Sequence, residues 1–340
     1  MVIVCAVCAV RTAARADEHA TSAARPEYEA TDHLLMWAGR RRAIERGFVV
    51  DVTYSLDTYA APQLKDRFVA GGLLTLELDV VDRIHVSAFA IHGGGVTNEL
   101  GDLHGTSGNT AERDVRVFEA WIDQPIGPAV VRAGLLAADQ EFVLADHSQL
   151  LLGATFGITS QFSANLLGPV YPIASPGVSA RVEHQRVGGR IAVYDGTLAN
   201  AHGIPTRLGP EVLLLGELTL LATFKLGAWH HTTRGDAVYA VLDRKLLPDL
   251  GVFARAGHSP NGKVATYLDA GVRVRPRGFR PADLFSIGLA HARAEPGDET
   301  AVELSYEVQI RWLSIQPDLQ LILMRDRTVG VMTTRLTVTL

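Results

Sequence analysis

The chain has 340 residues and a formal net charge of −5, and 47% of its residues are hydrophobic. The mildly acidic balance argues against nucleic acid as a partner, because phosphate backbones are bound by basic surfaces. No stretch offers the 18 or more uncharged apolar residues that a membrane helix needs, since Val212 to Trp229 is interrupted by Glu217 and Lys225. A membrane β-barrel and a large soluble β-protein both fit this composition.

The first 16 residues are predicted to be an export signal peptide. Val2 to Val10 is a short apolar run, and Ala14 to Ala16 is a small-x-small site that places cleavage before Asp17. No Lys or Arg precedes the apolar run. The only cysteines, Cys5 and Cys8, lie in this segment, so we expect neither a disulfide nor a thiolate metal site in the mature chain.

Residues 17–47 are predicted to form an N-terminal periplasmic segment with one short helix. From Leu34 to Arg46, apolar residues recur beside a basic cluster, as in an amphipathic helix. If the rest of the chain forms a barrel, this helix would either plug the mouth of that barrel or tether the N-terminus, and we favour the tether. After Gly47 the pattern changes to strict alternation, which continues to the C-terminus.

Alternating residues predict strands with one apolar and one polar face. From Val302 to Ile310 the even-numbered residues are apolar, whereas the odd-numbered ones include charges such as Glu303. Residues 264–274 repeat the pattern, with Val264 on the apolar face and Asp269 on the polar face. A polar inner face and an apolar outer face are typical of a transmembrane barrel, whereas a soluble barrel packs apolar side chains inside.

The alternation predicts an all-β fold, a transmembrane antiparallel β-barrel of 16 strands over residues 48–340. An even number is expected of a bacterial single-chain barrel, and short turns alternate with longer connections in the first half. The strands are expected near residues 48–57, 72–81, 84–92, 115–124, 129–137, 177–184, 189–195, 211–220, 222–230, 236–243, 250–256, 263–274, 283–290, 300–310, 313–323 and 329–340.

The third long connection, Ala138 to Pro176, is too large to be a simple turn. Loops of this length are usually functional. It also carries more apolar residues than a solvent-exposed loop should show, among them Phe156 and Phe162. We therefore expect it to fold into the lumen and narrow the pore.

Several motifs in the block from Ile84 to Glu183 are found together, in one order, in a known family. They are HVSAFAIHGGG (85–95), LGDLHGTSG (100–108), RVFEAWIDQ (116–124), VRAGLLAADQEF (131–142) and GPVYPIASPGV (168–178). Together with shorter similar segments elsewhere in the sequence, these motifs make the chain resemble the carbohydrate-selective porins of the OprB family. One departure is the terminal Leu340, where the family usually has an aromatic residue.

The resemblance implies an outer-membrane porin that lets glucose-like mono- or short oligosaccharides diffuse passively into the periplasm. It implies no enzymatic activity and no cofactor, with carbohydrate solutes and outer-membrane lipid as partners. A general non-selective porin on the same barrel is one alternative, and a soluble secreted sugar-binding β-protein is another. The sugar, the degree of selectivity and the oligomeric state, monomer or trimer, stay open.

Charges of both signs are expected along the lumen. Such a lining lacks the single-sign ring of an ion-selective pore and suits a neutral, hydroxyl-rich solute. Strand parity places in the lumen nine acids and seven bases: Asp51, Glu77, Asp79, Glu119, Glu183, Glu217, Asp269, Glu303, Glu307, and Arg132, Arg181, Lys225, Arg255, Arg273, Arg311, Arg335.

The constriction is expected where the long connection meets its flanking strands. Arg132 lies just before the connection and Arg181 just after it. Glu119 on the neighbouring strand, with Asp139 and Glu141 at the start of the connection, would face these arginines. The alternative is that these charges pair across the barrel wall or anchor the connection.

Three aromatic residues are candidates for stacking against a sugar ring. An aromatic face packs well against C–H groups, and Phe142, Tyr171 and Trp229 lie in or near the expected constriction. The alternative, which we favour, is that they belong to an interfacial girdle or pack the connection.

No metal site, phosphate loop or catalytic group is expected. His230 and His231 are adjacent on a strand and therefore point to opposite faces, although His85, His92 and His104 are close in sequence. The triple glycine at 93–95 opens no helix, and no nucleophile-elbow motif is present.

Overall fold

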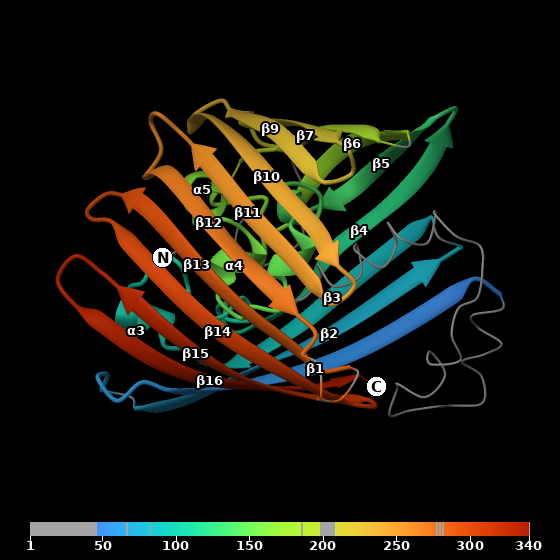
Figure 1. Cartoon of the computed structure of the whole chain (residues 1–340). Helices are drawn as coiled ribbons and strands as arrows, with labels where there is room; N and C mark the ends of the chain where they lie inside the picture. Colours follow the sequence, from blue (N-terminus) through green and yellow to red (C-terminus); the bar gives the residue numbers. More distant parts are fainter. Residues whose placement is uncertain are drawn as a thin grey trace.

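The computed structural model describes residues 46–339, except 66, 82, 185, 198–207, 277, 279 and 281. These residues form a closed antiparallel barrel in which sixteen strands follow one another around the wall and β1 pairs with β16 (Figure 1). Closure leaves no sheet edge, which is a requirement where lipid offers no hydrogen bonds. The predicted signal peptide, almost all of the predicted N-terminal helix and Leu340 lie outside the described residues.

The sixteen predicted strands each correspond to one observed strand, with ends that differ by a few residues. Short helices are found only in the connections within the described part of the chain, and none is long and apolar enough to span a membrane. The elements are β1 (Phe48–Ala60), β2 (Phe68–Val80), β3 (Ile84–Gly93), α3 (Thr97–Leu100), β4 (Asp114–Ile126), β5 (Ala129–Leu136), η2 (Ala138–Gln140), η3 (Asp146–Ser148), α4 (Ala154–Gly157), α5 (Ser160–Leu166), β6 (Ser175–His184), β7 (Val187–Asp195), β8 (Val212–Leu220), β9 (Phe224–His231), β10 (Gly235–Leu247), β11 (Leu250–His258), β12 (Val264–Val274), β13 (Leu284–Ala294), β14 (Glu299–Ile310), β15 (Leu313–Leu323) and β16 (Thr328–Thr339).

Side chains alternate between the inside and the outside of the barrel as the sequence predicts. On β14, Glu303 and Ser305 are 2% and 0% exposed, whereas Leu304 between them is 38% exposed. On β14 the outward-facing residues are therefore apolar and the inward-facing ones polar, the arrangement of a membrane barrel.

Two residues depart from the predicted faces. Alternation predicts Val264 on the outer face, but a register shift between Val264 and Thr266 turns it inward, where it is completely buried. Alternation predicts Arg311 in the lumen, but it is exposed in the β14–β15 turn with a φ of 53°. Simple alternation holds only while the strand is regular, because a bulge adds one residue and resets the faces.

The long connections in the first half of the chain leave from one end of the barrel, which we assign to the cell exterior because porin turns are short on the periplasmic side. The connection between β3 and β4 packs against β14 and β15. The N–H groups of Leu103 and His104 donate to Glu299 on β14, both at 2.9 Å, and Gln320 on β15 donates to the carbonyl of Thr106 at 2.8 Å. The extracellular mouth is thus covered in part by this connection.

Candidate functional site

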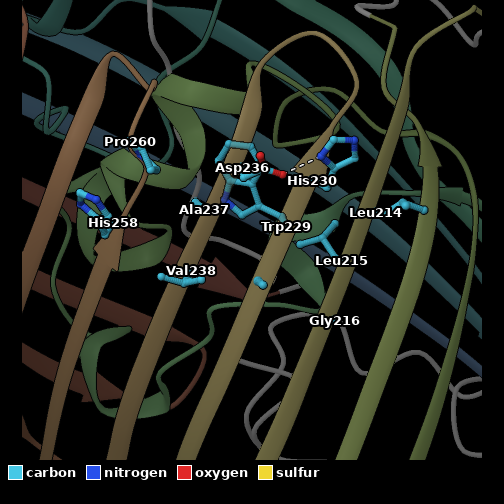
Figure 2. A pocket seen from close by; sticks show the side chains of 11 residues that line it. Leu214, Leu215, Gly216, Trp229, His230, Asp236, Ala237, Val238, His258 and Pro260 are labelled. Carbon is cyan, nitrogen blue, oxygen red and sulfur yellow. Dashed lines mark hydrogen bonds and ion pairs between the residues drawn. The ribbon is translucent and has the colours of Figure 1, made fainter.

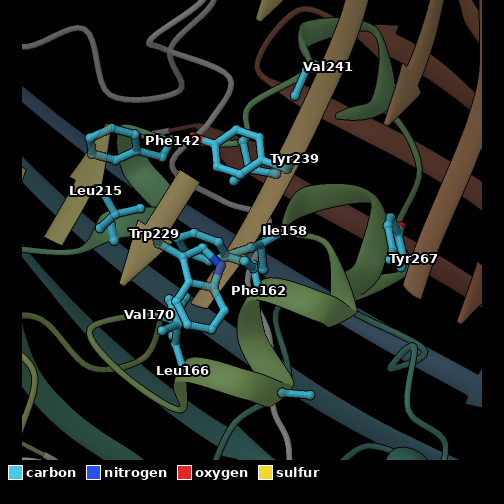
Figure 3. Packing of buried hydrophobic residues seen from close by; sticks show 14 of the residues in the cluster. Phe142, Ile158, Phe162, Leu166, Val170, Leu215, Trp229, Tyr239, Val241 and Tyr267 are labelled. Carbon is cyan, nitrogen blue, oxygen red and sulfur yellow. The ribbon is translucent and has the colours of Figure 1, made fainter. Parts of the chain in front are cut away.

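The connection between β5 and β6, residues 137–174, is a packed body rather than an open loop. Phe142, Phe156 and Phe162 are each completely buried. They share one hydrophobic cluster with inward-facing strand residues such as Trp229 and Tyr267 (Figure 3). Burial against the wall removes from water the apolar surface that the sequence showed in this connection.

Inward-facing carboxylates accept hydrogen bonds from backbone N–H groups of the β5–β6 connection. Four strands contribute one carboxylate each. The N···O distances are 2.9 Å from Ala137 to Glu119, 3.2 Å from Val143 to Glu217, 2.5 Å from Asp146 to Asp243 and 3.0 Å from Gly153 to Glu303. These bonds satisfy N–H groups that have no partner in regular secondary structure.

Inward-facing cations bind carbonyl groups of the same connection. The distances are 2.9 Å from Lys225 to the oxygen of Leu144, 3.0 Å from Arg273 to that of Asp146, and 2.9 Å and 3.0 Å from Arg255 to those of Thr155 and Phe156. Many of the charges expected to face a solute therefore hold the backbone of the connection.

The two flanking arginines meet at one carboxylate. Arg132 donates to both carboxylate oxygens of Asp123, at 2.7 Å and 3.0 Å, and Arg181 donates to Oδ2 at 2.9 Å. The Arg132 guanidinium also lies 3.4 Å above the ring of Trp121, a cation–π contact. The side chains of Arg132 and Arg181 keep 14% and 25% of their surface exposed.

Glu141 links this arginine pair to the connection. Its Oε1 is 3.5 Å from Nη1 of Arg132 and accepts from Ser179 at 3.0 Å, while Oε2 accepts from Tyr194 at 2.9 Å. Arg190 donates to the carbonyl of Glu141. The groups that contact Glu141 thus come from β5, β6 and β7.

The other predicted site residues are buried in supporting positions. Glu119 and Asp139 are 6% and 3% exposed, and Asp139 accepts from the N–H of Tyr171 at 3.2 Å. Tyr171 packs on Phe89 and Phe118, with ring centroids 5.2 Å and 5.5 Å away. The exposed fractions of Phe142, Tyr171 and Trp229 are 0%, 3% and 2%, so their rings pack on protein.

The sequence interpretation missed Asp123, Trp121 and Arg190. Asp123 and Trp121 alternate with outward-facing residues on β4 in the same way as Glu119, so the alternation that predicts Glu119 in the lumen predicts them there too. Arg190 lies on the same face of β7 as the buried Ala192 and Tyr194, so alternation along β7 would have predicted that it points inward.

The three histidines that are close in sequence lie apart in the structure. His85 pairs with Asp79 at 2.9 Å, His92 contacts Tyr54 at 3.0 Å, and Nε2 of His104 is 3.1 Å from the carbonyl of Glu299. Within the described ranges, no group of three or more His, Cys, Asp or Glu side chains could hold a metal ion.

The carboxyl group of Asp139, in the β5–β6 connection, has a raised pKa. Burial raises this pKa to about 7, and the hydrogen bonds from Tyr171 and Gln140 oppose the shift. An unfolded Asp titrates near a pKa of about 3.9, so the packed state binds more protons between these two values. Packing of the connection therefore weakens as the pH rises from about 4 to about 7.

We expect the single-channel current to fluctuate more at neutral pH than at pH 5, because ionised Asp139 loosens the connection. Asp139→Asn should remove most of this pH dependence, since the amide keeps its oxygen and cannot ionise. The measurement is current noise in planar bilayers across this pH range. Asp326→Asn, in the exposed β15–β16 turn, is the control, and an equal response in both variants would contradict the assignment.

Comparison with known proteins supports the fold and the family separately. Residues 83–246 match the family described as carbohydrate-selective porin, OprB family. None of the curated protein sequences matches the chain.

Solved structures with the same barrel include Pseudomonas putida OprB at high pH, with a TM-score of 0.78 and 12% identity over 91% of this chain and 99% of that one. Its low-pH structure has a TM-score of 0.60 and 14% identity over 94% of this chain and 100% of that one. A triple mutant of Rhodopseudomonas blastica porin has a TM-score of 0.56 and 10% identity, covering 86% of this chain and 100% of that one. At these identities the likeness is one of fold.

The family match agrees with the barrel closure, the polar interior and the apolar outer wall. A protein of this kind is a passive channel and not an enzyme. Residues 83–246 thus match the family of carbohydrate-selective porins, OprB family, and the closed barrel that contains them agrees with an outer-membrane porin through which sugars diffuse passively.

Proposed function

We propose that glucose-like mono- or short oligosaccharides pass this barrel at a constriction made by Arg132, Arg181 and the β5–β6 connection, folded into the lumen. The observation that carries the proposal is the arginine pair on Asp123. Both side chains keep exposed surface, whereas the groups around them are buried. A guanidinium offers five donors in a rigid plane, so N–H groups remain for the hydroxyls of a sugar.

The remaining predicted site residues are given a supporting role in this proposal. Glu119, Asp139 and Glu141 hold the connection through hydrogen bonds. Phe142, Tyr171 and Trp229 hold it by packing. A fixed connection keeps the arginines at one height and keeps the opening at one width.

A neutral solute fits the local balance of charge. Arg132 and Arg181 are faced by Asp123 and Glu141, so neither sign dominates next to the exposed donors. A ring of one sign would favour ions instead. Passive diffusion requires hydrogen bonds to the sugar hydroxyls that are weak enough to break easily.

The ends of the chain and its assembly complete the proposal. Residues 1–16 would be removed as a signal peptide, residues 17–47 would tether the N-terminus on the periplasmic side, and residues 48–340 would form the barrel. The protein would act as a monomer or a trimer of identical pores.

The test is conductance of the refolded protein in a planar bilayer while glucose is titrated in. We expect glucose to reduce the current, and Arg132→Ala to weaken this block by about tenfold, because a hydrogen bond from a charged donor is lost. Arg132→Lys should restore only part of the block, since an ammonium lacks the planar donor set.

Three results would overturn the proposal. Unchanged block in Arg132→Ala would remove Arg132 from the constriction. Bulk-like conductance that no sugar reduces would indicate a general porin on the same barrel. A mature chain that is soluble and whose gel mobility is unaffected by boiling would instead indicate a secreted β-protein.

A further inference from the structure

An apolar groove runs along the outer wall over β8, β9, β10 and β11 (Figure 2). It has a volume of about 410 Å³, and Gly216 and Ala228 form part of its floor. A Cβ atom added at Gly216 would meet no other atom within 4 Å, so the space above this residue is open. Leu214 and Val238 line the sides and are 47% and 58% exposed.

A second groove continues the first toward β6. It has a volume of about 620 Å³ and shares Gly216 and Ala228 with the first. Ile191, exposed by 66%, and Leu218, exposed by 45%, line it on β7 and β8. The two together make an elongated apolar depression on the wall that faces lipid.

Polar groups gather at the extracellular end of the first groove. His230 and His258 lie at the ends of β9 and β11 that are next to the extracellular side as assigned above, and both line the groove. Nδ1 of His230 lies 2.6 Å from Asp236, and Nδ1 of His258 lies 3.5 Å from Thr266. The Nε2 atoms of both rings make no hydrogen bond with the described residues.

The turns next to this end add positive charge. Arg234 is in the β9–β10 turn, and Lys263 is in the β11–β12 turn. Asp236 is the acidic residue that lines the groove, and its side chain is 70% exposed. Arg234 and Lys263 therefore lie in turns at the same end of the barrel as the two imidazoles and the Asp236 carboxylate, so this end carries several groups that can donate to an anionic headgroup.

We propose that this groove binds one phosphate-bearing lipid of the outer leaflet, with an acyl chain along Gly216 and Ala228 and the phosphate at His230 and His258. The acyl chain fills a depression whose lining atoms would otherwise lack contacts on one side. Imidazole N–H groups and the cations of the two turns hold the phosphate by charge-assisted hydrogen bonds. The lipid would thus bind at a defined position on the barrel wall, separate from the sugar pathway.

The test uses the refolded full chain in mild detergent, with diphosphorylated lipid A as the probe and native mass spectrometry as the measurement. We expect one lipid to remain bound at low lipid concentration. The double variant His230→Ala/His258→Ala should weaken binding about tenfold through loss of the phosphate contacts. Gly216→Leu should weaken it as well, because the leucine side chain would occupy the floor of the groove.

His92→Ala is the matched control, because His92 is an exposed histidine on β3 that does not line either groove. It should bind lipid A like the unaltered protein. All variants should retain glucose block, so a fault in the sugar pathway would be seen separately. Equal lipid binding by the unaltered protein and both groove variants would overturn the proposal, as would a signal from two chains in place of chain plus lipid.

Discussion

Replacing Arg255 with methionine is expected to release the β5–β6 connection while the barrel stays closed. Arg255 is 2% exposed, pairs with Asp269 at 2.6 Å and donates to carbonyls of the connection. Methionine fills similar volume but leaves the Asp269 carboxylate buried without its cation. Removing one partner of a buried pair costs about 3–5 kcal/mol. Most of this cost should fall on the docking of the connection, since Arg255 joins it to the wall.

The expected readout is a larger and noisier single-channel current with weaker glucose block. Heat-dependent gel mobility reports whether the barrel is folded. Arg311→Met is the matched control because Arg311 lies exposed in a turn, and it should leave current and block unchanged. A folded Arg255→Met barrel with a quiet current of normal size would show that the connection does not depend on this residue.

Replacing Asp123 with asparagine is expected to shift the selectivity of the pore toward anions and to weaken sugar block. Asp123 is the shared acceptor of Arg132 and Arg181. Without its charge, two guanidinium groups lose their common counter-ion in the proposed constriction. The excess of positive charge attracts anions, and the arginines are no longer held in one plane for hydroxyl recognition.

Reversal potential in a salt gradient measures this shift directly. We expect the ratio of anion to cation permeability to rise several-fold in Asp123→Asn. Glu183→Gln makes the same change in charge at an exposed position near the β6–β7 turn, and its effect should be small. Equal shifts in the two variants would mean that only total charge matters and that Asp123 has no special place.

Alternation was sufficient to predict the barrel, because closure and lipid impose the same two-residue period on every strand. The apolar residues of the β5–β6 connection also indicated burial, and Phe142, Phe156 and Phe162 are indeed buried. Alternation failed locally at Val264, where the register shifts, and at Arg311, which lies one residue beyond the predicted and observed end of β14, in the turn.

The partners of the charged groups were not predictable in the same way. Parity places Glu217, Glu303 and Arg255 inside, but it does not say that they bind backbone groups of the connection. Those contacts join residues 74, 150 and 100 positions apart, so they depend on the path of residues 137–174 across the barrel. That path is set by packing and by satisfaction of buried backbone groups, which have no local sequence period.

The sequence by itself determined that this protein is a closed 16-stranded membrane barrel with a buried β5–β6 connection, and its motifs indicated the resemblance to the OprB family. Only the tertiary structure decided which lumen charges remain exposed. It joins Arg132 and Arg181 at Asp123 and covers Phe142, Tyr171 and Trp229 with protein. The physical reason is that faces follow from the local geometry of a strand, whereas exposure depends on what another part of the chain covers.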